Sequence, residues 1–398
     1  MVAKINADTS GGLTITSDTS GTLEIQSAGT TKFTVNNAGV DIPAIGTIDG
    51  LTSINGGQVG GRRNIVINGA MKVAQRSASV AGLGAASGFF TLDRWKMLIG
   101  SASAGRYTMA QVADGPAGFA NCLKITTTTA DTSIAVGERL TLIQAIEGQD
   151  LQQLKKGTAS AEQFTVSFWV KGNANALYVC EIYDNDSATN ITQSFAVTTS
   201  WNRIELTFAA DTSNPLDDDN AASLTLFIWL HGGSTYTGGT FASNTWATAT
   251  TNNRYAVADR TSIFDATSRT FFITGVQMEI GSTATDFEHR SFGEELTLCQ
   301  RYYFTVPRTY GIASSATAMF TSVAFPVEMR ATPTLITILA TPSGESPRLV
   351  SGRTSTAISP TLALTDTKQA GIKFNGFSSM TAQQSALINT CVGLTAEL

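Results

Sequence analysis

The feature that most constrains this chain is a series of short segments in which apolar residues alternate with other residues at a period of two. The clearest segments span residues 164–170, 178–182, 204–208, 224–230 and 276–280. Successive side chains of a β-strand point to opposite faces of a sheet, so each segment predicts a strand with one face in a core. Strands of this kind separated by turns, from residue 64 to about 292, predict a β-sandwich.

The composition fits a mainly β fold. Hydrophobic residues make up 42% of the 398 residues, which is enough for real cores, and glycine is common (36) whereas proline is scarce (9). Charged residues make up only 14% of the chain. The single helix candidate within the sandwich, residues 143–154, fits an irregular loop equally well. Residues 293–304 predict a short helix that enters a last β domain.

The last domain is expected to contain four strands. Their predicted spans are 322–329, 334–339, 371–377 and 386–394.

Residues 11–42 contain a repeat in which apolar pairs recur every ten residues, as Leu13-x-Ile15, Leu23-x-Ile25 and Phe33-x-Val35. Glycines punctuate the repeat, so each unit predicts one short strand and a turn. A strand with two apolar side chains cannot offset its own ordering entropy. The repeat therefore favours an intertwined oligomer, and the alternative is a flexible linker rich in Gly, Ser and Thr.

Three parts follow from these patterns. Residues 1–60 are predicted to form an N-terminal β-repeat segment, residues 61–292 a β-sandwich, and residues 293–398 a C-terminal β domain. The weakly patterned, glycine-rich residues 43–63 mark the first boundary.

Charge and cysteine content narrow the partners and the compartment. A net charge of −5 leaves no basic stripe to neutralise phosphates, which argues against nucleic acid. The N-terminus lacks the apolar run of a signal peptide, and no stretch reaches the roughly 18–20 apolar residues that span a bilayer, so we expect synthesis in a cytoplasm without membrane insertion. The four cysteines lack metal-site spacing, so we expect reduced, buried thiols.

Enzymatic patterns are weak, and we expect no catalytic residues. His231 and His289 are the only histidines, and neither lies in a metalloprotease or nucleophile-elbow motif. A glycan depolymerase could use carboxylates alone, with Glu181, Asp184 and Asp186 as candidates, but a solvated acidic loop explains these residues as well.

No cofactor is expected. The run Asp217-Asp218-Asp219 could bind calcium, because calcium prefers oxygen ligands such as carboxylates. It is only a weak candidate, because the spacing of a known calcium-binding loop is absent.

Strand phase supplies a candidate glycan-binding site. The apolar residues of 224–230 share one face of their strand, so the aromatic residues between them point to the other face, and the same reasoning applies to the strands at 164–170 and 178–182. Polar neighbours complete the site. The candidate residues are Trp169, Lys171, Tyr183, Asp184, Phe227 and Trp229. Burial of this face against a neighbouring subunit or a long loop is the alternative.

Two blocks of sequence resemble a known family. The first holds Asn64-Ile-Val-Ile-Asn-Gly69, Gln75-Arg76-Ser77 and Asp93-Arg94-Trp95, and the second holds Gly275–Phe292 followed by Glu294-Glu295-Leu296 and Cys299-Gln-Arg-Tyr-Tyr303. They resemble phage and prophage tail-fibre or minor structural proteins. Residues 164–171 and 201–208 are similar to core strands of the carbohydrate-binding jelly rolls in that family. The run Phe325-Pro-Val-Glu-Met-Arg330 extends the resemblance as a further strand.

The resemblance implies that residues 1–60 are an attachment or shaft segment and that residues 61–292 are a jelly-roll lectin-like β-sandwich. It also implies an elongated homotrimer in the virion that joins other tail or virion proteins through its N-terminal region and binds a host cell-surface glycan. It implies no catalytic apparatus. The alternatives are a purely architectural virion protein, such as a fibre connector or a capsid or tail decoration, and a glycan depolymerase.

The repeat predicts that the purified protein is a trimer in solution. Light scattering should give the mass of three chains, because rungs this small need neighbouring rungs to be stable. A chain that stays monomeric and folded on dilution would contradict the intertwined shaft.

Overall fold

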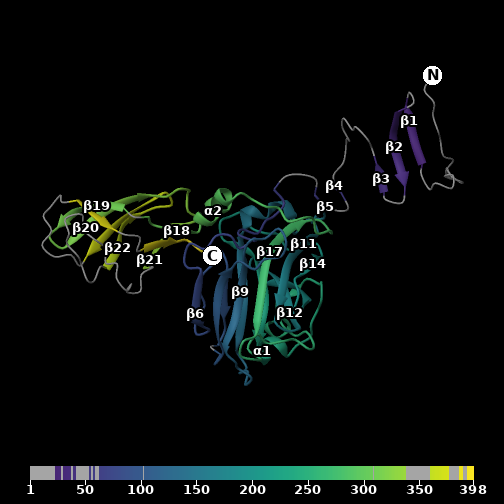
Figure 1. Ribbon diagram of the computed structural model, residues 1–398, viewed down its shortest axis with the longest axis horizontal. Helices are drawn as coiled ribbons and strands as arrows, with labels where there is room; N and C mark the ends of the chain where they lie inside the picture. Colours follow the sequence, from purple (N-terminus) through teal and green to yellow (C-terminus); the bar gives the residue numbers. More distant parts are fainter. Residues whose placement is uncertain are drawn as a thin grey trace. The chain divides into compact units, whose positions relative to one another are not determined.

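The computed structural model describes residues 23–27, 30–36, 39–41, 53–54, 57–58, 62–101, 103–307, 309–337, 359–375, 385–388 and 392–398. The chain divides into two compact units, Met1–Ile54 and Asn55–Leu398. Figure 1 shows the elements of both units. In the described part of the chain, no helix has the length and apolar character needed to cross a membrane.

The first unit contains a three-stranded antiparallel sheet of β1 (Leu23–Ser27), β2 (Thr30–Asn36) and β3 (Gly39–Asp41). In the register of β1 and β2, Leu23 pairs with Val35 and Ile25 pairs with Phe33. Two of the three predicted repeat units are therefore strands that pair with each other. The unit Leu13-x-Ile15 lies outside the described residues, and the role of the repeat in an oligomer stays a prediction. The short strands β4 (Ser53–Ile54) and β5 (Gly57–Gln58) follow in sequence.

Two six-stranded sheets form a β-sandwich in the second unit. The first sheet has the order β16-β13-β12-β15-β10-β7, and the second has the order β14-β11-β17-β9-β8-β6. The strands of the first sheet are β7 (Lys96–Ile99), β10 (Arg139–Glu147), β12 (Ala176–Asp184), β13 (Thr189–Val197), β15 (Ala222–Gly232) and β16 (Ala247–Thr248). The strands of the second sheet are β6 (Ser79–Leu83), β8 (Arg106–Val112), β9 (Cys122–Thr129), β11 (Phe164–Gly172), β14 (Asn202–Phe208) and β17 (Thr270–Ile280).

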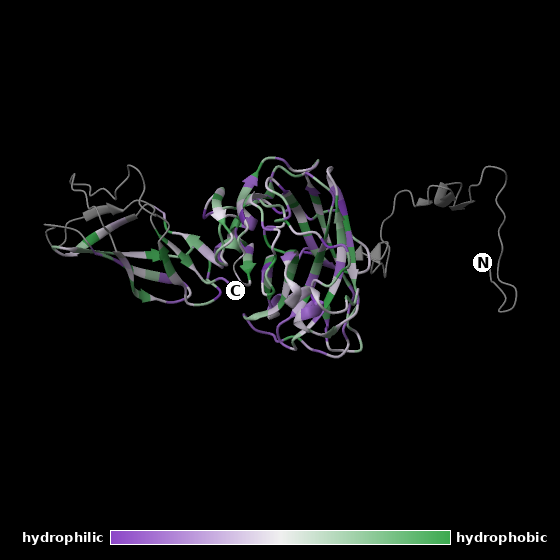
Figure 2. Cartoon of the chain, turned by 90° about the horizontal axis from the view of Figure 1, so that it is seen from below, coloured by the Kyte–Doolittle hydropathy of each residue, from purple (hydrophilic) through white to green (hydrophobic). Residues whose placement is uncertain are grey.

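All five strands predicted from the alternation are present, as β11, β12, β14, β15 and β17. The chain crosses repeatedly between the two antiparallel sheets, as in a jelly roll. Their inner faces enclose one hydrophobic core, in which Val166, Phe168, Leu226, Ile228 and Met278 have no exposed surface. Figure 2 shows hydrophobic and hydrophilic bands alternating along these strands. The mainly β sandwich is thus confirmed.

Residues 143–154 do not form the α-helix that was one of the two alternatives. Strand β10 continues to Glu147, because its pairing with β15 reaches Glu147, whereas β7 pairs with β10 only as far as Ile143. Two short 3-10 helices follow, η1 (Gly148–Asp150) and η2 (Gln152–Leu154). Apolar residues at helical spacing therefore belong partly to a fully buried strand, where both faces are covered and the alternation is lost.

The C-terminal part begins with the predicted short helix, α2 (Phe292–Gln300), which starts in a capping box at Ser291. Two sheets follow, with orders β18-β25-β21 and β22-β23-β20-β19-β24 around a separate hydrophobic cluster. Their strands are β18 (Tyr303–Thr305), β19 (Thr309–Ser315), β20 (Ala318–Ala324), β21 (Thr334–Thr337), β22 (Ser359–Thr365), β23 (Gln369–Asn375), β24 (Ser385–Ile388) and β25 (Val392–Thr395). That residues 1–60, 61–292 and 293–398 form three separate domains stays a prediction.

Two strand predictions in this part are wrong in detail. Strand β20 ends at Ala324, and residues 325–330 are irregular, because Pro326 cannot donate a ladder hydrogen bond. The described residues within 386–394 belong to two strands, β24 and β25, which lie in different sheets. The three described cysteines, Cys122, Cys180 and Cys299, are buried free thiols as expected.

Buried polar side chains close the sandwich where the two resembling blocks of sequence meet. The Glu288 carboxylate accepts hydrogen bonds from the backbone N–H groups of Arg63 (2.7 Å) and Asn64 (2.6 Å). The Arg290 guanidinium donates to the carbonyls of Asn64 and Val66. The segment from residue 62 to 78 contains no strand, so side chains from the other end of the sandwich satisfy its buried backbone.

A second buried network joins the sandwich to the C-terminal part. The Glu147 carboxylate accepts hydrogen bonds from the Arg301 guanidinium (2.9 and 2.7 Å) and from the Tyr302 hydroxyl. Burial opposes ionisation of Glu147, but these hydrogen bonds outweigh it and hold the pKa of Glu147 below its ordinary value. Glu397, near the C-terminus, pairs with Arg76 (3.0 Å) and Arg94 (2.7 Å). The motif residues therefore act as structural links.

Asp93 in this network makes stability depend on pH. Burial raises the pKa of Asp93 from 3.8 to about 6, although the charge of Arg76 opposes the shift. A raised folded-state pKa means that Asp93 stabilises the fold when protonated, and that this contribution is lost as the pH rises through about 6. We expect a loss of about 3 kcal/mol between low and neutral pH.

The variant Asp93→Asn should lack this loss. Urea unfolding of parent and variant at several pH values between about 4 and 7 measures the difference in slope, whatever the absolute stability of the variant. Parallel curves would show that Asp93 is not the titrating group.

Candidate functional site

The structure separates the six predicted glycan-binding residues. Tyr183, Asp184, Phe227 and Trp229 lie on β12 and β15 of the first sheet, whereas Trp169 and Lys171 lie on β11 of the second sheet. The four aromatic residues therefore cannot form one platform.

A covering segment, defined as residues 233–261, closes the outer face of the first sheet. It contains α1 (Ser234–Thr237), β16 and η3 (Thr251–Asn253). The ring centroids of Tyr236 and Tyr255 lie 5.2 and 5.7 Å from that of Trp229, which has no exposed surface. Phe227 is 6% exposed. The prediction of an exposed aromatic platform is therefore wrong for Phe227 and Trp229. Both residues pack under a long loop, which was the alternative.

Arg254 of the covering segment completes this buried cluster. Its guanidinium carbon lies 4.8 Å from the ring centroid of Tyr183, 4.7 Å from Phe227 and 5.2 Å from Trp229. The Glu181 carboxylate accepts hydrogen bonds from Arg254 Nε (2.7 Å), Trp229 Nε1 (2.6 Å) and Asn190 Nδ2 (2.8 Å). The aromatic cluster and its one carboxylate are thus occupied by groups of the chain itself.

The remaining predicted carboxylates of the first sheet have structural partners. Asp184 is buried and pairs with Lys156, which also pairs with Asp211 at 2.9 Å. Asp186 Oδ2 accepts a hydrogen bond from the Asp217 backbone N–H (3.0 Å). Glu181, Asp184 and Asp186 therefore do not form an exposed carboxylate pair.

The acidic run is exposed, as its sequence predicts. Asp217, Asp218 and Asp219 each lie at the surface. Across the residues that the structure describes, no three His, Cys, Asp or Glu side chains are grouped to hold a metal ion.

The outer face of the second sheet carries an aromatic surface that we call the Trp169 face: Trp169, Lys171, Trp201, Phe272 and Lys124. The strand register builds it. Lys171 on β11 pairs with Phe272 on β17, which pairs with Lys124 on β9. Trp169 pairs with Arg203 on β14, and Trp201 lies just before that strand. Trp169 and Trp201 are therefore diagonal neighbours on one face, at a separation of about 7–8 Å.

Cations lie between the rings of the Trp169 face. Lys171 Nζ is 5.1 Å from the ring centroid of Trp201 and 4.8 Å from that of Phe272, and it pairs with the Asp114 carboxylate at 2.9 Å. Lys124 Nζ is 5.2 Å from the Phe272 ring. Trp169 and Trp201 are both half-buried.

Gly275 positions the Trp169 ring. Its φ is +62°, and a Cβ atom there would lie 3.1 Å from Trp169 Cδ1 and 2.7 Å from the Phe119 ring. The two rings therefore pack on bare backbone, which only glycine permits. Phe119 in turn contacts Phe287 and His289, with ring centroids 5.0 and 5.1 Å away.

Sequence reasoning found Trp169 and Lys171 but missed their partners. Trp201 lies outside its strand, and Phe272 lies in an eleven-residue strand whose interior is buried on both faces. Phase alone could not assign either residue. The signal that unites them is the order of β14, β11, β17 and β9 in the sheet, which the sequence does not reveal.

This arrangement suits recognition of a sugar. A sugar ring presents apolar C–H groups to an aromatic face and hydroxyl groups to neighbouring polar side chains. The Trp169 face offers two partly exposed indoles, a lysine ammonium and the Asp114 carboxylate. The Trp201 Nε1 donor is buried and has no hydrogen-bond partner among the described residues, so the ring face of Trp201, rather than its N–H, is the part open to a ligand.

Comparison with known proteins gives distant likenesses. No family model matches the sequence, and no curated protein matches it. Among solved structures, a CBM4 structure is 16% identical and covers 54% of this chain and 97% of its own, with a TM-score of 0.28. The enzymatically active domain of tailspike protein 4 of bacteriophage CBA120 is 13% identical and covers 55% of this chain but 21% of its own, with a TM-score of 0.29. The family 11 carbohydrate-binding module from Clostridium thermocellum, in complex with a β-1,3-1,4-mixed-linked tetrasaccharide, is 12% identical and covers 52% and 98%, with a TM-score of 0.27. At these scores a binding site or an activity cannot be carried over.

The two aromatic clusters predict opposite effects on stability. Trp229→Ala should lower the free energy of unfolding by about 3–5 kcal/mol, because it leaves a cavity and a buried Glu181 carboxylate short of one donor. Trp201→Ala, the matched control, should cost less than about 2 kcal/mol because its ring is already partly in water. Urea unfolding of both variants measures the contrast, and equal losses would contradict the assignment of one closed and one open cluster.

Proposed function

We propose that this chain is a tail-fibre-type structural subunit of a bacteriophage virion and that it binds a host cell-surface glycan through the Trp169 face. One observation carries the proposal. The outer face of the second sheet presents Trp169 and Trp201 partly open, with Lys171 and Asp114 beside them, while the aromatic residues of the first sheet are closed.

The position of the resembling sequence blocks supports the class. Their residues form the two buried networks that close the sandwich and attach the C-terminal sheets to it. The resemblance to phage fibre proteins therefore concerns a scaffold, in which a lectin-like sandwich and a following β domain are fixed to each other.

The charge of the face favours a neutral or weakly charged glycan. Lys171 is paired with Asp114, and Arg203 is paired with Glu205 at 3.2 Å. Lys124 is the cation of this face that has no carboxylate partner among the described residues, and it lies over Phe272. Ring stacking then supplies most of the affinity, as is typical of aromatic anchors at a recognition surface.

Three further parts of the proposal rest on the sequence. The chain forms a homotrimer, its N-terminal region joins other tail or virion proteins, and it has no catalytic activity. Glu181 and Asp184, the carboxylates that a depolymerase would need, are engaged in buried ion pairs. A purely architectural virion protein is the alternative, and it would not bind the host surface.

Removing the open indoles should abolish recognition. The double variant Trp169→Ala/Trp201→Ala should bind host cells and purified host polysaccharide at least about thirtyfold more weakly, because truncated aromatic anchors cost about 2 kcal/mol or more in total. Phe292→Ala, which removes a ring that is 57% exposed elsewhere, is the matched control and should bind as the parent does.

Three results would count against this function. Full binding by the double variant would remove the Trp169 face as the receptor site, and no binding by the parent would favour the architectural alternative. Release of reducing ends from the polysaccharide would show a depolymerase instead.

A further inference from the structure

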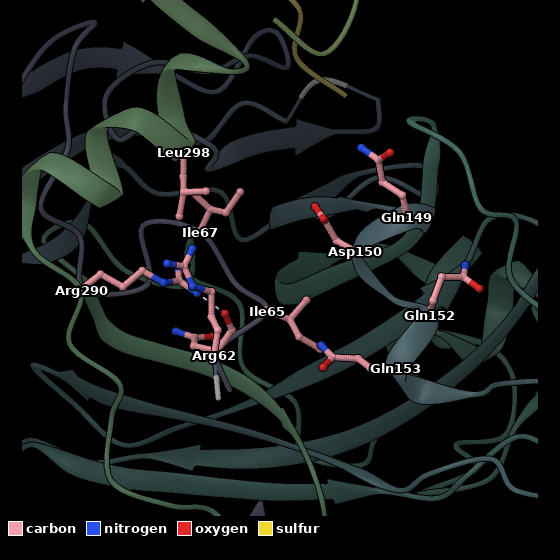
Figure 3. Close-up of a pocket in the computed structure, with 10 residues that line it drawn as sticks. Arg62, Ile65, Ile67, Gln149, Asp150, Gln152, Gln153, Arg290 and Leu298 are labelled. Carbon is pink, nitrogen blue, oxygen red and sulfur yellow. Dashed lines mark hydrogen bonds between the residues drawn. The ribbon is translucent and has the colours of Figure 1, made fainter. Parts of the chain in front are cut away.

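A polar pocket of about 380 Å³ lies apart from the Trp169 face and shares no residue with it. Three segments that are distant in the sequence line it: residues 62–67, residues 149–153 of η1 and η2, and the region of α2. Figure 3 shows Gln149, Asp150, Gln152 and Gln153 on one wall and Arg62 and Arg290 on the other, with Ile65, Ile67 and Leu298 among them. Pockets of this size suit a small ligand.

The wall formed by residues 62–67 is fixed in place. The Gln144 side chain accepts a hydrogen bond from the Ile67 N–H and donates one to the Ile67 carbonyl, both at 2.8 Å. Arg290, which is 7% exposed, holds the carbonyls of Asn64 and Val66. This wall cannot collapse into the pocket without breaking buried hydrogen bonds.

The opposite wall is fixed as well. The backbone N–H groups of Gly148 and Gln149 donate to the carbonyls of Ala221 (3.2 Å) and Asp219 (3.0 Å). The Gln152 amide nitrogen donates to the carbonyls of Gly148 and Asp217, both at 3.1 Å. A Cβ atom at Gly148 would lie 2.0 Å from the Asp217 carbonyl oxygen, so the segments are in direct contact. The pocket is therefore preformed, which limits the entropy lost on binding.

The lining side chains present mainly acceptors. The amide nitrogens of Gln149 and Gln152 are used within the protein, which leaves their amide oxygens for a ligand. Within the described residues, the Asp150 carboxylate and the Gln153 amide make no hydrogen bond. Arg290 Nε is a buried donor that is likewise unpartnered in this part of the chain.

These groups define the chemistry of the occupant. It must bring several donors and few charges, since Arg62 is already paired with Glu294 at 3.1 Å and Arg290 with Glu295 at 3.4 Å. An anion would meet Asp150 and acceptor oxygens, and a cation would meet two guanidinium groups. Hydroxyl groups satisfy both requirements because each one donates and accepts.

We propose that this pocket is a second binding site, which takes a single neutral, hydroxyl-rich sugar residue through Asp150, Gln149, Gln152 and Gln153, with the ring resting on Ile65 and Leu298. The site is independent of the Trp169 face. The pocket would hold one sugar residue or the end of a glycan chain, whereas the Trp169 face suits several consecutive sugar residues.

Saturation-transfer NMR on the full chain tests the site with four probes: glucose, galactose, mannose and N-acetylglucosamine. At least one should bind with a Kd of about millimolar. The variant Asp150→Ala/Gln153→Ala should raise that Kd at least about tenfold, because it removes two hydrogen-bonding groups. Both side chains are exposed and make no hydrogen bond within the described residues, so the variant should melt with the parent.

The control variant Trp201→Ala separates the two sites. It should leave monosaccharide binding unchanged, even if it abolishes binding of host polysaccharide. Monosaccharide binding that survives Asp150→Ala/Gln153→Ala but is lost in Trp201→Ala would overturn the pocket and leave the proposed function intact. Binding of none of the four sugars would also overturn it.

Discussion

The structure depends on buried side chains that satisfy a backbone without a strand partner. Residues 62–78 enter the sandwich without forming a strand, yet Asn64 and Val66 are buried. Glu288 and Arg290, from the far end of the same domain, supply the missing hydrogen bonds. Because an unsatisfied buried polar group costs about 1–3 kcal/mol, this seam fixes both ends of the sandwich together. It also sets the start of α2, and through α2 the place of the C-terminal sheets.

The same seam explains the two candidate sites. It forms one wall of the polar pocket, so that pocket is preformed for a structural reason. The difference between the two outer faces has another cause, the length of the connections. Thirty-odd residues join β15 to β17, and they cover the first sheet with Tyr255 and Arg254. The connections of the second sheet leave Trp169 and Trp201 partly open.

Much of the fold was predictable because period-two alternation is a local property. All five strands expected from it are present, and α2 follows from the capping box at Ser291 and Glu294. The sequence did not predict a strand at residues 143–147, because β10 is buried on both faces there and the alternation of apolar and polar residues is lost. The prediction of a single strand at 386–394 was wrong, because pairing partners far along the chain decide which sheet each of β24 and β25 joins.

The site was harder to predict than the fold. Phase correctly gave the outer faces, but it could not show that Trp169 and Trp229 lie in different sheets or that a long loop covers Trp229. Burial of Asp184 with Lys156 was also beyond the sequence, because Lys156 lies in a loop without periodicity. The polar pocket had no signal in the sequence, since three distant segments build it.

Fluorine NMR of protein labelled with fluorotryptophan tests the central claim, that the open face of the second sheet is the recognition surface. The chain has five tryptophans, so each resonance can be assigned with single Trp→Phe variants. On titration with host surface polysaccharide, the resonances of Trp169 and Trp201 should shift together, and those of the buried Trp95 and Trp229 should not. Shifts confined to Trp229, or no shift at any tryptophan while the polysaccharide binds, would contradict the account.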